Sequence, residues 1–146
     1  MIIPIASDHA GFPAKEKVKK ALESLGHIPV DYGTHSEDSV DYPDYAKMVA
    51  KAVAEKEYER GILVCGSGQG MCMSANKFDG VRAALAWNPE IAALSSQHNN
   101  ANVLCLPGRF ITDNDLKDIV KAWFESEFEG GRHLRRVDKI NNINNE

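Results

Sequence analysis

Five short apolar runs alternate along the chain with stretches that repeat apolar residues at helical spacing. The runs cover residues 2–6, 28–32, 61–65, 81–86 and 103–106. After the first run, Val18, Ala21, Leu22 and Leu25 recur at steps of three and four, which places them on one face of a helix. Short apolar strands separated by such helices predict a parallel sheet covered on both faces. We therefore expect an α/β protein: a three-layer α/β/α sandwich around a Rossmann-like five-stranded parallel sheet.

Length and composition are those of an ordinary globular domain. The chain has 146 residues, of which 43% are apolar and 26% charged, so we expect a single domain over residues 1–146. The longest apolar run is far shorter than the roughly 18 residues of a membrane span, and residues 1–10 lack a signal-peptide pattern. These features predict a cytoplasmic protein without a membrane partner. The net charge of −4 argues against a nucleic-acid partner.

The charge is unevenly distributed, because residues 132–146 carry +2 and the rest of the chain −6. Arg132 and Arg136 are four apart and share a helix face. Two guanidinium groups on one face suit a phosphate dianion, and Arg109, after Pro107-Gly108, could join them. The alternative for each arginine is a surface salt bridge.

Polar residues follow three of the predicted strands. Asp8 and His9 follow the first strand, Cys65 ends the third, and residues 107–110 follow the fifth. Ligands of open parallel sheets bind outside the carboxyl ends of the strands. We therefore expect these residues to meet at one edge of the sheet.

A glycine-rich loop, residues 66–70, lies between the third strand and the next helix. Gly66, Gly68 and Gly70 let a ligand approach the main chain, and the loop N–H groups and helix dipole favour an anion. Met71 stands where a dinucleotide fingerprint needs glycine and where a Cys-x5-Arg phosphatase loop needs arginine. A Walker loop is also excluded, because the Gly-Lys-Ser/Thr run is missing. A purely structural tight turn is the alternative.

Cys65 and two histidines are candidates for acid–base chemistry. A thiol near a helix N-terminus is expected to have a lowered pKa, so Cys65 could act as a nucleophile or base; otherwise it is a small buried hydrophobe. Asp8 and His9 form either an acid–base pair or a loop cap. His98 is either a proton shuttle or a cation at a helix C-terminus.

Six segments in this order resemble the ribose-5-phosphate isomerase type B family, which includes galactose-6-phosphate isomerase. The segments are Ser7-Asp8-His9-Ala10-Gly11-Phe12, Asp41-Tyr42-Pro43, Cys65-Gly66-Ser67-Gly68-Gln69-Gly70, Ala75-Asn76-Lys77, Gln97-His98-Asn99 and Glu129-Gly130-Gly131-Arg132-His133. The resemblance implies isomerisation of ribose 5-phosphate to ribulose 5-phosphate through a cis-enediolate, in the non-oxidative pentose phosphate pathway. It also implies a homodimer or dimer of dimers, with the active site at the subunit interface and without a metal or cofactor.

The resemblance assigns roles to individual residues. Cys65 is the implied base, because the glutamate used by another branch of the family is replaced here by Met71. The loop N–H groups and Ser67 would hold the oxyanion, while His98 opens the sugar ring and Asp8 moves protons at O1 and O2. The implied phosphate ligands are His9, Arg132 and Arg136, with Arg109 and Asn99 reaching in from a neighbouring subunit.

Other functions remain open from sequence. The substrate could be allose 6-phosphate, galactose 6-phosphate or an unphosphorylated rare sugar. The chain could instead be a nucleotide-binding or sensor module, or a hydrolase or phosphatase that uses Cys65.

Overall fold

A five-stranded parallel sheet forms the centre of the protein. The computed structural model describes residues 1–145. The strands are β1 (Ile2–Ser7), β2 (Ile28–Asp31), β3 (Gly61–Cys65), β4 (Ala83–Leu85) and β5 (Val103–Pro107). They run in the order β2-β1-β3-β5-β4, and every neighbouring pair is parallel.

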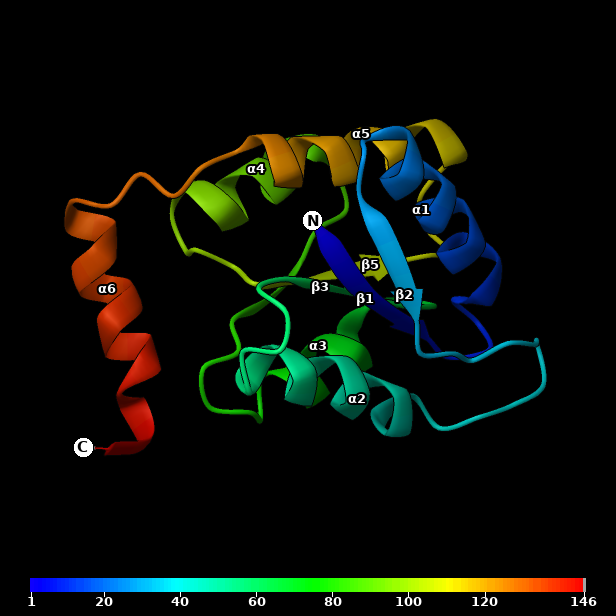
Figure 1. Cartoon of the computed structure of the whole chain (residues 1–146), viewed down its shortest axis with the longest axis horizontal. Helices are drawn as coiled ribbons and strands as arrows, with labels where there is room; N and C mark the ends of the chain where they lie inside the picture. Colours follow the sequence, from blue (N-terminus) through cyan, green and yellow to red (C-terminus); the bar gives the residue numbers. More distant parts are fainter. Residues whose placement is uncertain (146) are drawn as a thin grey trace.

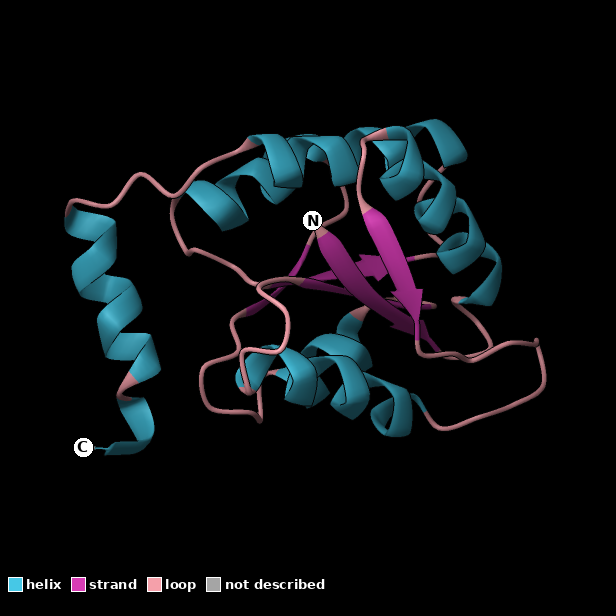
Figure 2. Cartoon of the chain, viewed as in Figure 1, coloured by secondary structure: helices cyan, strands magenta, loops and turns pink. Residues whose placement is uncertain are grey.

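Helices cover both faces of the sheet (Figures 1 and 2). One layer holds α1 (Phe12–Ser24), α4 (Pro89–Gln97) and α5 (Asp113–Glu125), and the other holds α2 (Tyr42–Ala54) and α3 (Gln69–Ala75). The predicted three-layer α/β/α fold is thereby confirmed.

The core is split into two clusters by the pleat of the strands. Successive side chains of a strand point to opposite faces, so Ile62 and Val64 pack toward the layer of α1 and α5, whereas Leu63 and Cys65 pack toward α2 and α3. Cys65 therefore lies on the side of the sheet that α3 covers.

The last helix, α6 (Arg132–Asn141), stands away from the three layers (Figure 1). It follows a turn in which Gly130 and Gly131 have φ values of +65° and +57°, which glycine adopts readily. Val137 is its one buried residue. Leu134 and Ile140, three residues before and after Val137 on the same face, are about half exposed.

Two predicted boundaries differ from the structure. The strand expected over residues 81–86 is shorter, because the N–H of Arg82 donates to the Asn102 side chain instead of joining a ladder. The helix expected from Met71 begins at Gln69, directly after Gly68. Within residues 1–145, the helices are all too short or too polar to cross a membrane.

Candidate active site

The carboxyl ends of β1, β3 and β5 meet through backbone hydrogen bonds. The Asp8 N–H donates to the Val64 carbonyl over 3.3 Å, and the Gly108 N–H donates to the Cys65 carbonyl over 2.8 Å. The Arg109 N–H donates to the Gly66 carbonyl over 3.1 Å. The predicted gathering of these residues at one edge is confirmed.

The glycine loop folds over the Cys65 thiol. Cys65 is only 4% exposed, and its Sγ accepts the Gly68 N–H over 3.1 Å. Gly68 has a φ of +76°, and a Cβ there would lie 2.5 Å from Leu85 Cδ1. Both the backbone conformation and the lack of space therefore require glycine at this position.

The acidity of Cys65 differs from the sequence expectation. Burial raises the pKa of the thiol above its ordinary value. The backbone N–H groups of Met71 and Gly68 oppose this increase, and the Asp8 carboxylate adds to it. The predicted lowering of the pKa is wrong, because desolvation outweighs the loop N–H groups.

Asp8 is buried beside this thiol and shapes the turn into α1. Its Oδ1 accepts the Gly11 N–H over 2.8 Å, so the predicted loop-capping role is present. Gly11 itself has no room for a side chain, since a Cβ would overlap the Val64 carbonyl oxygen. This close approach holds the Asp8 turn against the end of β3.

His9 and Arg109 line a hollow of about 330 Å³ next to the loop. The Val40 N–H donates to His9 Nδ1 over 3.1 Å, so the neutral ring carries its proton on Nε2. A Cβ on Gly66 would lie 3.4 Å from Arg109 Cδ. Arg109 thus lies beside the loop of its own chain, which corrects the expectation that it comes from a neighbouring subunit.

Two residues around the loop complete this edge. Ser67 is exposed, and its Oγ accepts the Gln69 N–H over 3.4 Å. The Tyr42 ring, from the start of α2, covers Gly70 so closely that a Cβ there would overlap it. A role for Tyr42 was not predicted from sequence, although the Asp41-Tyr42-Pro43 segment includes it.

His98 and Asn99 lie at the opposite edge of the sheet. They follow α4 and precede β5, and Asn102, which also precedes β5, accepts the Gly61 N–H at the amino end of β3. The four residue steps from Gly61 to Cys65 span about 13 Å. Within one chain, His98 and Asp8 therefore lie at opposite edges of the sheet.

A cluster of ionisable side chains surrounds His98. Its ring stacks on His133 with centroids 4.3 Å apart and an interplanar angle of 11°, and Glu129 Oε1 lies 3.6 Å from Nε2 of both rings. Burial lowers the pKa of His133, and His98 and Arg132 lower it further. Glu129 and His133 had no role assigned from sequence, although they lie four residues apart around the double-glycine turn.

Arg132 and Arg136 are exposed and belong to α6. This helix lies away from the carboxyl ends of β1 and β2 (Figure 1). The predicted site residues therefore form two groups in one chain. The first, which we call the thiol edge, comprises Asp8, His9, Cys65, Arg109 and the loop residues Gly66, Ser67, Gly68 and Gly70. The second, which we call the histidine edge, comprises His98, Asn99, Arg132 and Arg136.

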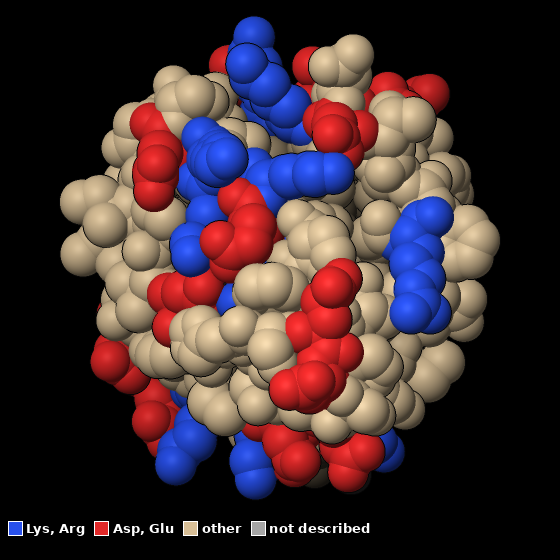
Figure 3. Space-filling model, turned by 90° about the vertical axis from the view of Figure 1, so that its right-hand side faces the viewer, with Lys and Arg blue, Asp and Glu red and all other residues tan. Residues whose placement is uncertain are grey.

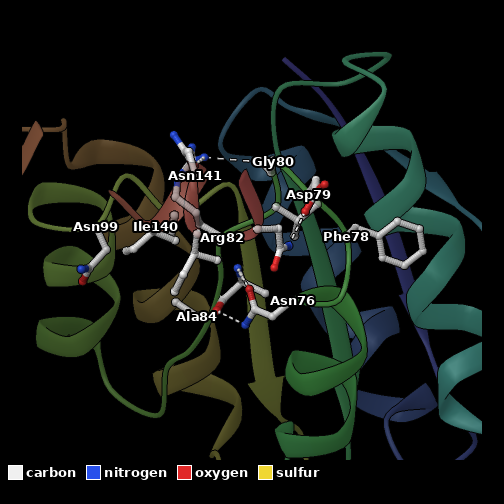
Figure 4. Close-up of a pocket in the computed structure, with 14 residues that line it drawn as sticks. Asn76, Phe78, Asp79, Gly80, Arg82, Ala84, Asn99, Ile140 and Asn141 are labelled. Atoms are coloured by element: carbon white, nitrogen blue, oxygen red, sulfur yellow. Dashed lines mark hydrogen bonds between the residues drawn. The ribbon is translucent and has the colours of Figure 1, made fainter. Parts of the chain in front are cut away.

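A second hollow, of about 440 Å³, lies between α6 and the edge strand β4 (Figure 4). Asn99, Arg82 and Ile140 line it. Arg82 donates from Nε to the Asn100 carbonyl over 2.9 Å and from a terminal nitrogen to Asn141 Oδ1 over 3.0 Å. These bonds attach the far end of α6 to the sheet, and the hollow belongs to the histidine edge.

The fold and this edge are those of a class of α/β proteins in which ligands bind outside the carboxyl ends of a parallel sheet, here beside a glycine loop. A family model described as Ribose/Galactose Isomerase matches residues 3–140. The chain belongs to this family of isomerases.

Relatives cover nearly the whole chain. Ribose-5-phosphate isomerase B of Escherichia coli is 44% identical over 141 residues, which is 97% of this chain and 95% of that protein. The structure of a ribose 5-phosphate isomerase from Thermotoga maritima is 51% identical, with a TM-score of 0.93 and coverage of 96% and 97%. Ribose-5-phosphate isomerase B from Mycoplasma genitalium, solved with bound ribulose 5-phosphate, is 46% identical, with a TM-score of 0.94 and coverage of 99% and 97%.

Proposed function

We propose that this chain, acting as one domain over residues 1–146, interconverts ribose 5-phosphate and ribulose 5-phosphate, with Cys65 as the base. The observation that carries the assignment is the buried Cys65 thiol, held under the Gly68 N–H and next to the Asp8 carboxylate. The names of the relatives support the substrate. Membership in an isomerase family favours this reaction over the nucleotide-binding, sensor and phosphatase alternatives.

In this proposal, the Cys65 thiolate takes the proton from C2 of the open-chain aldose and returns it to C1. The enediolate formed between these two steps carries negative charge on oxygen. The N–H groups of the glycine loop and the Ser67 hydroxyl donate hydrogen bonds to that oxygen, which is the usual means of stabilising such a charge. Asp8 carries the hydroxyl proton from O2 to O1. The raised pKa of Cys65 makes its thiolate a stronger base once it has formed.

The proposed site is completed by a second copy of the chain, in a homodimer or a dimer of dimers. Two observations support this arrangement. The thiol edge and the histidine edge lie at opposite ends of the strands, and α6 stands apart with Leu134 50% and Ile140 46% exposed. In the dimer, His98 of one copy opens the sugar ring bound at the thiol edge of the other. His9 and Arg109 of one copy and Arg132 and Arg136 of the other hold the phosphate, with Asn99 beside them.

Other partners and the location of the protein stay predictions. Ion pairs such as Lys17–Asp113 at 2.7 Å and Lys19–Asp31 at 2.9 Å place basic and acidic side chains together around α1. Both signs of charge lie close together on the face in Figure 3. This mixture favours a small-molecule substrate over nucleic acid. Independence from metals and cofactors is likewise a prediction.

The test is an isomerase assay on the purified full chain. Ribose 5-phosphate is compared with allose 6-phosphate, galactose 6-phosphate and unphosphorylated ribose, and the highest kcat/KM is expected for ribose 5-phosphate.

The variant Cys65→Ala should lose about 10²–10⁴-fold in kcat with little change in KM, which is the usual contribution of a general base. Cys72→Ala is the matched control and should keep the parent rate, and EDTA should have no effect. Turnover of Cys65→Ala near that of the parent would remove Cys65 as the base.

A further inference from the structure

Two imidazoles and one carboxylate converge where the chain enters α6. His98 follows α4, Glu129 precedes the double-glycine turn and His133 lies in the first turn of α6. One potential ligand atom from each of the three lies within 4.8 Å of the others. This trio, which we call the His-Glu-His cluster, is separate from the thiol edge.

The spacing within the His-Glu-His cluster is too long for hydrogen bonds and fits a shared metal ion once the stacked His98 and His133 rings turn so that both Nε2 lone pairs point at it. Glu129 Oε1 lies 3.6 Å from Nε2 of His98 and of His133, beyond the 2.7–3.2 Å of good N–H···O bonds. Two ligands bound tetrahedrally at about 2.0–2.1 Å from Zn²⁺ lie roughly 3.4 Å apart. Two histidines and one glutamate also form a known zinc ligand set, with the fourth position left open.

Backbone contacts hold all three ligand residues in place. The His98 N–H donates to the Leu94 carbonyl over 2.9 Å, and the Glu129 N–H donates to the Gln97 carbonyl over 3.0 Å. The His133 N–H donates to the Gly130 carbonyl over 3.0 Å. In the single chain the side chains of His98 and Glu129 are 40% and 52% exposed, so an ion can reach them there from solvent.

We propose that His98, Glu129 and His133 bind a transition-metal ion, best matched by Zn²⁺, and that this ion inhibits the isomerase. The inhibition rests on the proposed function, because the ion occupies the His98 imidazole that opens the sugar ring. Arg132 and Arg136 on the same helix disfavour a cation. The site is therefore confined to metals that prefer imidazole, such as Zn²⁺, Co²⁺ and Ni²⁺, and excludes Mg²⁺ and Ca²⁺, which prefer oxygen ligands.

Metal binding is measured directly on the full chain by competition of Zn²⁺ with a chromophoric chelator and by the absorption spectrum of added Co²⁺. We expect one ion per chain and a spectrum of nitrogen and oxygen ligation. Glu129→Gln and His133→Gln should each weaken Zn²⁺ at least about tenfold, since even the loss of an outer partner of a metal site costs 10- to 100-fold. The control His35→Gln removes an exposed histidine outside the cluster and should bind as the parent does.

The possible results separate the two parts of the proposal. Unchanged Zn²⁺ affinity in both cluster variants, or a thiolate-to-cobalt band from Cys65, would overturn the site, and neither measurement needs enzyme activity. If the parent is an active isomerase, micromolar Zn²⁺ should inhibit it, and EDTA should restore its activity. In Glu129→Gln the inhibition by Zn²⁺ should weaken in parallel with Zn²⁺ binding. Binding without inhibition would overturn the inhibitory role while leaving the proposed function intact. An inactive parent that still binds Zn²⁺ at the cluster would count against the proposed function alone.

Discussion

The reactivity of Cys65 should rise steeply with pH, because burial raises the pKa of its thiol above the ordinary value of 9.0. A thiol with such a pKa is less than about 1% ionised at pH 7, and its thiolate fraction grows about tenfold for each pH unit below the pKa. Since the thiolate is the nucleophile, alkylation of Cys65 by iodoacetamide should accelerate about 100-fold between pH 7 and pH 9.

Peptide-resolved mass spectrometry can follow this reaction together with an internal comparison. Cys72 has a pKa lowered by a hydrogen bond with Cys105, so it should be alkylated before Cys65 at pH 7. The Asp8 carboxylate contributes to the raised pKa of Cys65, and Asp8→Asn removes this charge while keeping an oxygen that can accept the Gly11 N–H. This variant should therefore react faster at Cys65 than the parent does at the same pH.

A Cys65 alkylation rate that is flat from pH 6.5 to 8.5 would refute this reasoning. Such a result would mean that the loop N–H groups outweigh burial and that the thiolate is already present at neutral pH. Slower alkylation of Cys65 in Asp8→Asn would separately refute the assigned effect of the carboxylate.

Two further predictions concern stability and substrate binding. Lys15 is fully buried, and its Nζ donates to Asp31 Oδ1 over 2.7 Å. Lys15→Met should lower the free energy of unfolding, measured in urea, by about 3 kcal/mol. This is the lower end of the cost of breaking a buried ion pair, because Lys19 still contacts Asp31. A loss under about 1 kcal/mol would contradict this reading. Arg132→Ala should raise KM for ribose 5-phosphate and leave kcat nearly unchanged. Arg135→Ala is its control, and equal kinetics for the two variants would remove Arg132 from the phosphate site.

The fold was predictable because its main signal is local. Apolar runs that alternate with helices bearing one apolar face predict a parallel sheet with helices on both faces. This fold class can be predicted without knowing the strand order. Strand β4 was overestimated at both ends. The N–H of Arg82 there bonds the Asn102 side chain, a contact between residues distant in sequence.

The thiol edge was predictable from chain order alone, since residues that directly follow parallel strands share an edge. The same rule would have separated His98 from it, because His98 and Asn99 precede β5 and so lie at the amino edge. The acidity of Cys65 could not be read from sequence, because its direction depends on burial by α3 and the glycine loop. The buried Lys15 did leave a signal, since it shares one face of α1 with Val18 and Leu22.

The central claim, that each active site combines Cys65 of one copy with His98 of another, is tested most directly by mixing two inactive variants. Cys65→Ala and His98→Asn are unfolded together in equal amounts, refolded and assayed with ribose 5-phosphate. In a mixed dimer one site regains both residues and the other loses both, so random pairing should restore about a quarter of the parent activity. Refolded mixtures that contain mixed dimers and remain inactive would contradict a site shared between two copies.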